Sequence, residues 1–528
     1  MQRYYLGLDL STQKLKAIII DDLLKLVHCD EVEFDKELSE FDTHGGVLRS
    51  KDNPDHVVAP VLMWLKAIDL LLDKLVKSGL DLSKIVALSG SAQQHGSVYW
   101  KKEAEQYLTQ LNSNEFLHTQ LANCFTIMQS PVWMDSSTTK QCHDFEQAVG
   151  GPKVLATITG SRAYERFTAA QIKKIYEHLP EVYASTGHIS LISSFVCSLF
   201  CGKIVPIDTS DASGMNLYDI TKKQWNQLCL KACAPNLNEK LKEPVDSNTC
   251  IGTVSNYYVE RFGFSASCKV IVFTGDNPST LAGMCLDNDW LTISLGTSDT
   301  VLLTVEEPKL LLNGHILCNP IHANSYMAML CFRNGSRCRE KIRNTCADSS
   351  WEIFDKLLNM TPSGNFGNFG LYYDTQEILP AIKGEYRYNE HGIKIDKFPL
   401  NEIEIRAIIE GQCIAKRVHA EDIGYQFSKD TKILATGGAS KNRSILQVLA
   451  DVLNCPVYIQ DVVDSAMLGA AYRAKFGLYK YENQLECNYF DIIKPESQPV
   501  LICQPNKEAE SVYSSMMNRY RNIISELC

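Results

Sequence analysis

Two aspartates stand where a carboxylate could act on a bound ligand. Asp276 lies in the segment Gly275–Pro278, directly after an apolar stretch, and Asp9 lies near the end of the apolar segment 4–10. A carboxylate at a strand end can accept the proton of an attacking hydroxyl, or hold Mg²⁺ through water. Taken alone, each residue is more often an ordinary turn aspartate, because Asp is common in tight turns.

Three short turns have the composition of phosphate-binding loops. Ser11-Thr12-Gln13 follows Asp9, Gly296-Thr297-Ser298 interrupts the apolar segment 291–305, and Gly437-Gly438 precedes an amphipathic stretch. Glycine allows a ligand to approach the backbone closely, and turn amides can cradle phosphate oxygens. Each turn is a weak signal by itself, but the three together predict one nucleotide site.

The elements that position these residues alternate between strand and helix. We expect β-hairpins at 4–20 and 291–305, a helix at 57–76 and a strand at 84–89. After residue 271 the pattern predicts a strand, a turn and a helix with Pro278 in its first turn. Residues 431–454 predict a strand, a double glycine and an amphipathic helix, and 508–524 a weaker helix.

Composition limits the class of protein. A chain of 528 residues is long enough for two sizeable domains. The net charge is −10, with 52 Lys and Arg against 62 Asp and Glu, so no basic field would attract nucleic acid or an anionic membrane. The 19 cysteines lack paired spacing and are expected to be reduced thiols. Asp9 interrupts the first apolar stretch, so no secretory signal is predicted and we expect a cytoplasmic protein.

Nine motifs, in their order along the chain, resemble the FGGY family of carbohydrate kinases within the actin, sugar kinase and Hsp70-like ATPase superfamily. They are LGLDLSTQ, SAQQHG, WMDSST, SRAYERFT, SDASGMNL, FTGDNPSTLAGM, SLGTSDT, ATGGASKN and DSAMLGAAY. The resemblance covers nearly the whole chain and is greatest to members that phosphorylate D-xylulose. It implies an α/β fold of two ribonuclease-H-like (actin-like ATPase) domains with an interdomain active-site cleft.

The resemblance also implies a division of the chain. We expect a sugar-binding N-terminal domain at 1–271 that carries the first phosphate hairpin, and an ATP-binding C-terminal domain at 272–486. A C-terminal extension at 487–528 is expected to pack on the second domain.

The site residues follow from the same motifs. Asp276 is implied as the catalytic base, and Asp9 as the residue that positions Mg²⁺ through water together with ATP. The implied sugar-binding residues are His95, Arg166, Asp276 and Asn277, with Gln94, Trp133 and Asp135 in the surroundings. The implied ATP-binding residues are Thr12, Gly296, Thr297, Trp351, Gly437, Gly438, Lys441 and Asn442. A polyol needs several directed hydrogen bonds, which suits the sugar set. Without the motifs, His95 reads as a strand-end histidine, Arg166 as a surface arginine and Trp351 as a core tryptophan.

The predicted function is ATP-dependent phosphorylation of D-xylulose to D-xylulose 5-phosphate by direct in-line transfer. Ribulose, glycerol or another polyol are alternative substrates, and an actin- or Hsp70-like ATP-driven binding protein is an alternative of another class. The chain has Ser11 where the family usually has glycine, and FTAAQIKKIYEHLP meets the family's kinase signature only loosely, which widens the choice of sugar. We expect the sugar and Mg-ATP as ligands, no nucleic acid or membrane as partner, and a monomer or homodimer.

Overall fold

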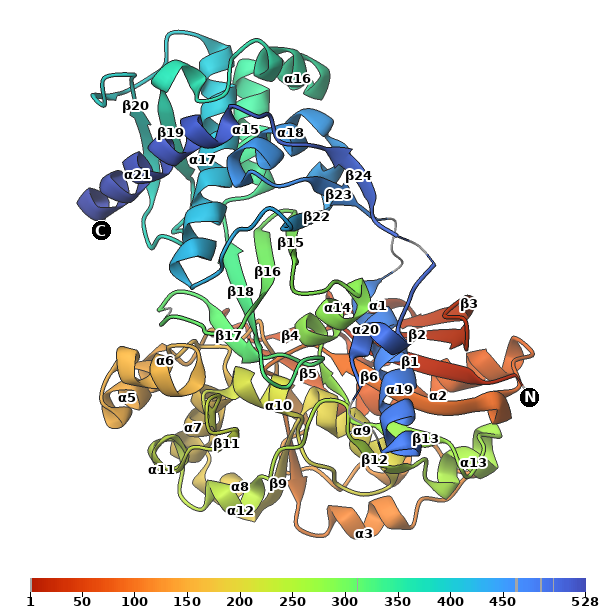
Figure 1. The fold of residues 1–528 in the computed structure, drawn as a ribbon. Helices are drawn as coiled ribbons and strands as arrows, with labels where there is room; N and C mark the ends of the chain where they lie inside the picture. The colour runs from red at the N-terminus through yellow and green to blue at the C-terminus, as the bar shows by residue number, and fades with distance from the viewer. Residues whose placement is uncertain (1, 311, 461–463, 485–486, 497) are drawn as a thin grey trace. The chain divides into compact units, whose positions relative to one another are not determined.

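The protein is described by a computed structural model that covers residues 2–310, 312–460, 464–484, 487–496 and 498–528 (Figure 1). The chain forms two compact units. The first comprises Met1–Cys285, Leu317–Asn324 and Val462–Glu496, and the second comprises Leu286–Ile316, Ser325–Asp461 and Ser497–Cys528.

The first unit is built on a mixed sheet with the strand order β12-β13-β6-β1-β2-β3, in which β14 also pairs with β6. The strands are β1 (Tyr4–Leu10), β2 (Lys14–Asp21), β3 (Leu26–Glu33), β6 (Ile85–Ala92), β12 (Cys250–Thr253), β13 (Lys269–Ile271) and β14 (Thr274–Gly275). Strand β1 is antiparallel to β2 and parallel to β6, so the predicted first hairpin is confirmed.

Alternating side chains of this sheet enter two different cores. Leu6 and Leu8 pack in the same core as Trp64 of helix α2 (Val61–Lys77), whereas Tyr5 and Ile18 pack with residues of helix α19 (Ser465–Asn483). This is the period of two expected of a sheet covered on both faces. Figure 1 shows α19, in blue, beside the red strands β1 and β2. The predicted helix at 57–76 is wrong at its start, because Val57–Pro60 forms strand β5, the central strand of a separate three-stranded sheet.

Helix α14 (Asp276–Met284) crosses α19 at unusually close range. A Cβ atom added at Gly283 would lie 1.9 Å from the carbonyl oxygen of Ser465, and one at Gly469 would lie 1.8 Å from that of Ser279. The two glycines therefore let the helix backbones touch. The crossing places α14 in the first unit, so the structural division falls after Cys285 and not at the expected position after residue 271.

Helix α19 also returns from the far end of the chain to the first unit, whereas 272–486 was expected to be one continuous domain. A Cβ atom at Gly7 of β1 would lie 2.4 Å from the carbonyl oxygen of Met467, so α19 rests directly on the sheet. Residues 487–496 belong to the first unit and Ser497–Cys528 to the second. The expected boundary at 486 lies outside the described residues.

The second unit repeats this strand arrangement, with the order β17-β18-β16-β15-β22-β23-β24. The strands are β15 (Trp290–Leu295), β16 (Asp299–Val305), β17 (His315–Cys318), β18 (Tyr326–Phe332), β22 (Lys432–Thr436), β23 (Val457–Ile459) and β24 (Val500–Cys503). Strand β15 is antiparallel to β16 and parallel to β22, as β1 is to β2 and β6. Both predicted hairpins are present, and each supplies the first two strands, in chain order, of the sheet of its unit.

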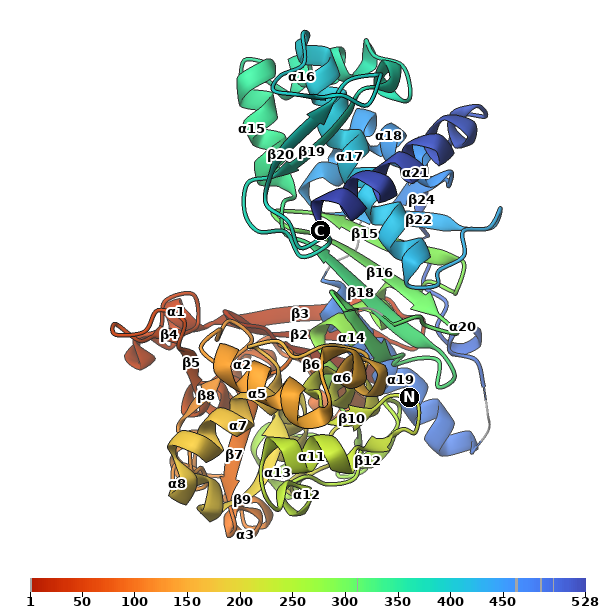
Figure 2. The same cartoon turned by 90° about the vertical axis from the view of Figure 1, so that its left-hand side faces the viewer.

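Long helices cover the second sheet. Helix α17 packs against α18 and α21 (Figure 2). The helices of this unit are α15 (Ser336–Cys346), α16 (Trp351–Asn359), α17 (Asn401–Asp422), α18 (Arg443–Leu453) and α21 (Ala509–Leu527). The predicted helices after Gly437-Gly438 and at 508–524 correspond to α18 and α21.

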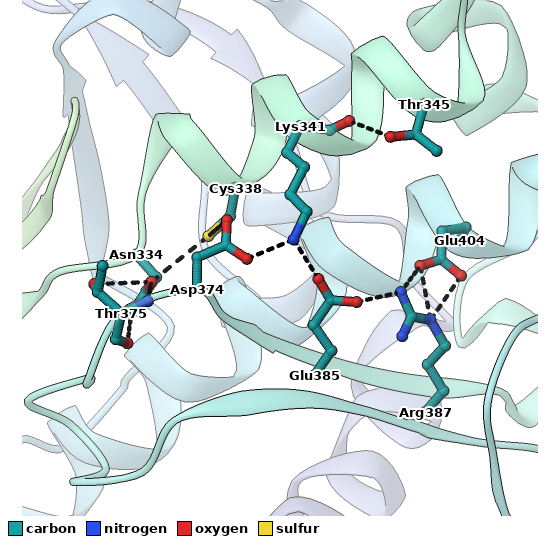
Figure 3. Close-up of polar contacts among 9 residues, drawn as sticks. All are labelled: Asn334, Cys338, Lys341, Thr345, Asp374, Thr375, Glu385, Arg387 and Glu404. Atoms are coloured by element: carbon teal, nitrogen blue, oxygen red, sulfur yellow. Dashed lines mark hydrogen bonds and ion pairs between the residues drawn. The ribbon is translucent and has the colours of Figure 1, made fainter.

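Alternating charges attach α15 to the small sheet of β19 (Phe369–Tyr373), β20 (Gly384–Tyr388) and β21 (Lys394–Ile395) (Figure 3). Lys341 of α15 binds Asp374 at 2.7 Å and Glu385 at 2.6 Å, and Arg387 joins Glu385 to Glu404 of α17. A network of several charges holds geometry better than one exposed pair. This network of charges therefore stabilises helix α15, which carries the cavity-lining residues Ser336 and Arg339.

The 19 cysteines are free thiols, as predicted. Among the described residues, no helix is both long enough and apolar enough to cross a bilayer.

Candidate active site

Asp9 is buried near the end of β1, where two side chains contact its carboxylate. Ser91 donates to Oδ1 at 2.7 Å, and Lys16 Nζ lies 3.4 Å from Oδ2. Lys16 also binds Asp464, which caps α19. Burial raises the pKa of Asp9 to about 6, opposed by Lys16 and reinforced by Asp464. The site thus holds two carboxylates and one ammonium group at the turn of the first hairpin.

The turn itself tolerates Ser11 without strain. Ser11 donates through its backbone N–H (2.9 Å) and its hydroxyl (3.0 Å) to the carbonyl oxygen of Lys14. The φ of Ser11 is not positive, so glycine is not required at this position. The departure from the family pattern therefore leaves the hairpin intact.

Asp276 is the first residue of α14 and keeps one carboxylate oxygen available. Asn277 donates to Asp276 Oδ1 from its backbone N–H at 2.8 Å and from its side-chain Nδ2 at 3.1 Å. No hydrogen bond from the described residues reaches Oδ2. Burial and then the negative charge of Asp9 raise the pKa of Asp276 to about 7. A carboxylate with a pKa near the working pH is suited to general base catalysis.

Gln94 and His95 follow β6 and lie in the same region of the first unit. Gln94 Oε1 accepts from Asn277 Nδ2 at 2.9 Å, which joins the QQHG motif to the GDNP motif. The buried His95 Nδ1 lies 2.9 Å from the carbonyl oxygen of Gly214. Because a carbonyl only accepts, Nδ1 carries the hydrogen, and Nε2 is an acceptor for a ligand hydroxyl. Burial, followed by the charge of Arg166, lowers the pKa of His95 to about 3 and keeps the ring neutral.

Backbone and ring contacts fix the orientation of His95. Its φ is 72°, an uncommon value for a residue with a side chain. The ring stacks on Phe167 with the centroids 4.4 Å apart, and the Arg166 guanidinium lies 5.6 Å from the same Phe167 ring. The structure therefore places Arg166 beside His95, while Gln94, the neighbour of His95, contacts Asn277.

Trp133 and Thr12 meet although they were predicted for different ligands. Trp133 Nε1 donates to Thr12 Oγ1 at 2.9 Å, and the Trp133 ring remains 44% exposed. Because the hydroxyl of Thr12 accepts from the indole, its own hydrogen remains available for a ligand. Trp133 therefore lies beside the turn of the phosphate hairpin.

Asp135 has a structural part in the loop. Its Oδ1 accepts from Ser137 (2.6 Å) and Gln171 (2.8 Å), and its Oδ2 accepts from the Val57 N–H (2.9 Å) and contacts His56. Burial alone would raise the pKa of Asp135, but these hydrogen bonds outweigh it and lower the pKa. With both oxygens occupied by protein groups, Asp135 anchors the loop that presents Trp133.

The second unit contains a cavity of about 600 Å³ that is lined by the predicted ATP residues of that unit except Gly437. Gly296, Thr297, Trp351, Gly438, Lys441 and Asn442 line it, together with Leu295, Ser336, Arg339, Glu340, Asp355, Ala439 and Ile445. Trp351 is 37% exposed, which excludes its reading as a core tryptophan. Arg343 lies over its ring at 4.7 Å and holds it at the rim.

The loop at Gly296 and Thr297 directs its carbonyl oxygens into the protein. The Gly296 oxygen accepts from the Ser336 N–H (2.8 Å) and from Arg339 (3.3 Å), and the Thr297 oxygen accepts from the Gly335 N–H (3.2 Å). Arg339 is held by both oxygens of the buried Asp299, at 2.8 and 3.0 Å. Occupying the carbonyls in this way removes acceptors that would repel a phosphate.

Asn442 lines the other side of the cavity, and Gly437 directly precedes the lining residue Gly438. Gly437 has a φ of 81°, and a Cβ atom there would lie 2.8 Å from the carbonyl oxygen of Leu295, so only glycine fits. Asn442 caps α18 by accepting from the Ile445 N–H at 3.0 Å, and it donates to Asp355 at 2.7 Å. Asn442 thus orders the cavity wall through both ends of its amide.

Mg²⁺ fits the donor set at Asp9. The described residues contain no group of three or more His, Cys, Asp or Glu side chains that would enclose a metal ion. An ion beside Asp9 would therefore take its remaining ligands from water and phosphate oxygens, which is the usual coordination of Mg²⁺ in such sites.

Lys16, Asp464 and Arg339 lie at these sites but were not predicted from the sequence. Lys16 could have been predicted, because a short hairpin turn places it directly opposite Asp9 in the strand register. Asp464 and Arg339 reach their sites only through tertiary packing.

Comparison with known proteins agrees with the motifs. Residues 4–283 match the N-terminal domain of the FGGY family of carbohydrate kinases, and residues 291–478 match its C-terminal domain. The chain belongs to the FGGY family of carbohydrate kinases. As an FGGY carbohydrate kinase the protein is a phosphotransferase, and its two-domain α/β fold is the predicted one.

Individual relatives of this FGGY kinase share nearly its full length. Xylulose kinase of Rattus norvegicus is 51% identical over 522 residues, which are 99% of this chain and 96% of the rat protein. Xylulose kinase 2 of Arabidopsis thaliana is 46% identical over 485 residues, 90% of this chain and 87% of the plant protein.

Solved structures resemble the fold at low identity. Ligand-bound xylulose kinase from Lactobacillus acidophilus superposes with a TM-score of 0.78 at 19% identity, covering 99% of this chain and 98% of that chain. Plasmodium falciparum glycerol kinase with ADP gives 0.75 at 16% identity, covering 100% and 98%. These likenesses concern the fold alone.

Proposed function

We propose that this FGGY kinase transfers the γ-phosphate of ATP to D-xylulose and forms D-xylulose 5-phosphate. The observation that carries the chemistry is Asp276, whose Oδ1 is held by Asn277 while Oδ2 stays available. The sugar assignment is supported by the high identity to xylulose kinases over nearly the whole chain.

The sugar would bind through residues of the first unit. Asp276 Oδ2 accepts the proton of the attacking hydroxyl as the new P–O bond forms and the bond to ADP breaks. His95 Nε2 accepts a second sugar hydroxyl, while Arg166 and the Asn277 side chain supply further hydrogen bonds. Directed groups of this kind discriminate strongly against ligands that leave them unpaired.

ATP would bind through the cavity of the second unit. Trp351 offers a flat surface for the adenine ring, and the amides of Gly296 and Thr297 face the phosphates. Asp9 would hold Mg²⁺ through water, and the ion would supply charge neutralisation for the phosphate oxygens. Lys16 neutralises Asp9 and keeps it ionised against the cost of burial.

A substrate panel tests this proposal. Turnover of D-xylulose, D-ribulose and glycerol is measured by coupled ADP formation, and the phosphorylated position is read by ³¹P NMR. We expect D-xylulose to have the highest kcat/KM and to be phosphorylated at its 5-hydroxyl. Equal kcat/KM for glycerol and D-xylulose would overturn the sugar assignment, and the alternatives of ribulose or another polyol are outcomes of the same panel.

A further inference from the structure

The motif SDASGMNL supplies the contacts that hold two neighbouring residues of the sugar site. It forms the short helix α10 (Thr209–Ala212) and the turn η3 (Ser213–Met215), both buried. Gln94 Nε2 donates to Asp211 Oδ1 at 3.2 Å, and His95 Nδ1 donates to the Gly214 carbonyl oxygen at 2.9 Å. One buried segment therefore orients both side chains.

The segment is itself firmly fixed. Asp208 caps α10 by accepting from the N–H groups of Ser210 and Asp211, each at 3.2 Å. Thr274, two residues before Asp276, donates to Asp208 at 2.8 Å. Ser193 of α9 (Ile192–Cys201) donates to Asp211 Oδ2 at 2.5 Å. Asp211 is thus held from several elements of the first unit.

A chain of hydrogen bonds with a defined direction leads from Asp211 to the base. Because Asp211 accepts from Gln94 Nε2, the Gln94 oxygen must face the other way, where it accepts from Asn277 Nδ2 at 2.9 Å. The second hydrogen of Asn277 Nδ2 then points at Asp276 Oδ1, 3.1 Å away. The Asn277 oxygen and Asp276 Oδ2 are left to face a ligand. Reversing the Gln94 amide would set two donors against each other and disturb both groups.

We propose that Asp211 is a positioning residue for sugar recognition, which fixes the Gln94 amide and through it Asn277 and the catalytic carboxylate. This inference rests on the proposed function and adds a residue that does not touch the sugar. Gly275 supports it, because a Cβ atom there would lie 2.5 Å from Gln94 Cγ and 2.7 Å from Asp211 Oδ1. The start of α14 is therefore packed directly on the Gln94–Asp211 pair.

The surroundings of the Asp211 carboxyl point to Asn as a conservative replacement. Burial, and then the charge of Asp208, raises its pKa to about 8, with Asp276 adding to the shift. Ser193 and Gln94 bind the same carboxyl, and Arg473 faces Asp208. Asn has the same shape as Asp and an oxygen that accepts from Gln94, so it should replace Asp211 closely.

The test compares Asp211→Ala with Asp211→Asn. The Kd for D-xylulose is measured by calorimetry, the Kd for ADP by the same method, and kcat by coupled ADP formation. For Asp211→Ala we expect the D-xylulose Kd to rise about tenfold or more, since a buried donor of Gln94 loses its partner, with the ADP Kd unchanged. Asp211→Asn should stay within about threefold of the wild type.

A double-mutant cycle separates positioning from a general effect on packing. If Asp211 acts through Gln94, adding Asp211→Ala to Gln94→Met should raise the D-xylulose Kd by less than about twofold. Ser193→Ala, which removes the other hydrogen bond of the same carboxyl, serves as the matched control and should leave the D-xylulose Kd within about threefold. Additive losses in the cycle, or an equal rise in the ADP Kd, would overturn the inference.

Failure of the proposed function and failure of this inference give different results. If wild-type protein does not bind D-xylulose, the proposed function fails. If wild type binds and Asp211→Ala binds equally well, only the inference fails. Should Asp211→Ala not fold, Gly275→Ala perturbs the same pair from outside and should raise the D-xylulose Kd about tenfold; an unchanged Kd in that variant would count against the inference.

Discussion

Replacing Asp276 by Asn should remove catalysis and, at the same time, stabilise the fold at alkaline pH. Burial and the charge of Asp9 raise the pKa of the Asp276 carboxyl from 3.8 to about 7. A carboxyl with a raised pKa binds more protons in the folded than in the unfolded state, so stability is lost as the pH rises. The contribution is fully present below about pH 3.8 and is gone once the pH has passed about 7.

The magnitude follows from this window. Each pH unit within it changes the free energy of unfolding by at most about 1.4 kcal/mol for one group. Between pH 5 and pH 8 the Asp276→Asn variant should therefore gain about 1–3 kcal/mol relative to the wild type. Asn keeps the oxygen that accepts from Asn277, so local hydrogen bonds are preserved. At pH 8, kcat should fall by about 10²-fold or more, because the base is absent.

Thermal unfolding of the ligand-free protein at pH 5, 6, 7 and 8 measures the stability effect. We expect the Tm of Asp276→Asn, relative to the wild type, to rise by roughly 2–5 °C across this range. Asp135→Asn is the matched control with the opposite sign, because the pKa of Asp135 is lowered and its carboxylate stabilises the fold above about pH 3.8. A wild-type to Asp276→Asn difference that stays constant from pH 5 to pH 8 would refute the reasoning.

Three further predictions concern the same sites. The kcat/KM for D-xylulose should rise with pH through about 7, as Asp276 ionises, and a profile flat from pH 5 to pH 8 would contradict the base assignment. Trp351→Ala should raise the Kd for ADP about tenfold and leave sugar binding unchanged; calorimetry with each ligand decides. Asn442→Ala should lower the free energy of unfolding by about 1 kcal/mol, because the N-cap of α18 is lost, and it should also weaken ADP binding. Asn442→Ser should recover the stability, because Ser can cap the helix, but it should not restore the contact to Asp355.

The local elements of the site could be predicted from the sequence. Apolar alternation and turn composition predict the two hairpins, and also the strand and double glycine that lead into helix α18, because these patterns act over a few residues. Asp276 at the start of α14 follows from the same kind of pattern. Only the order of motifs along the chain distinguished it from an ordinary turn aspartate.

Tertiary packing decided which of these groups meet. Asp211 and Gln94 are 117 residues apart, and nothing local in either motif indicates their contact. The return of α19 to the first unit depends on close backbone approach at Gly7 and Gly469, which a hydrophobic pattern does not encode. The donors of Asp135 include Val57 and Gln171, which lie far from it in the sequence, and together with Ser137 they occupy both of its oxygens. The sequence by itself determined the chemistry available to this kinase, while long-range packing determined the pairing, burial and charge state of each group that uses it.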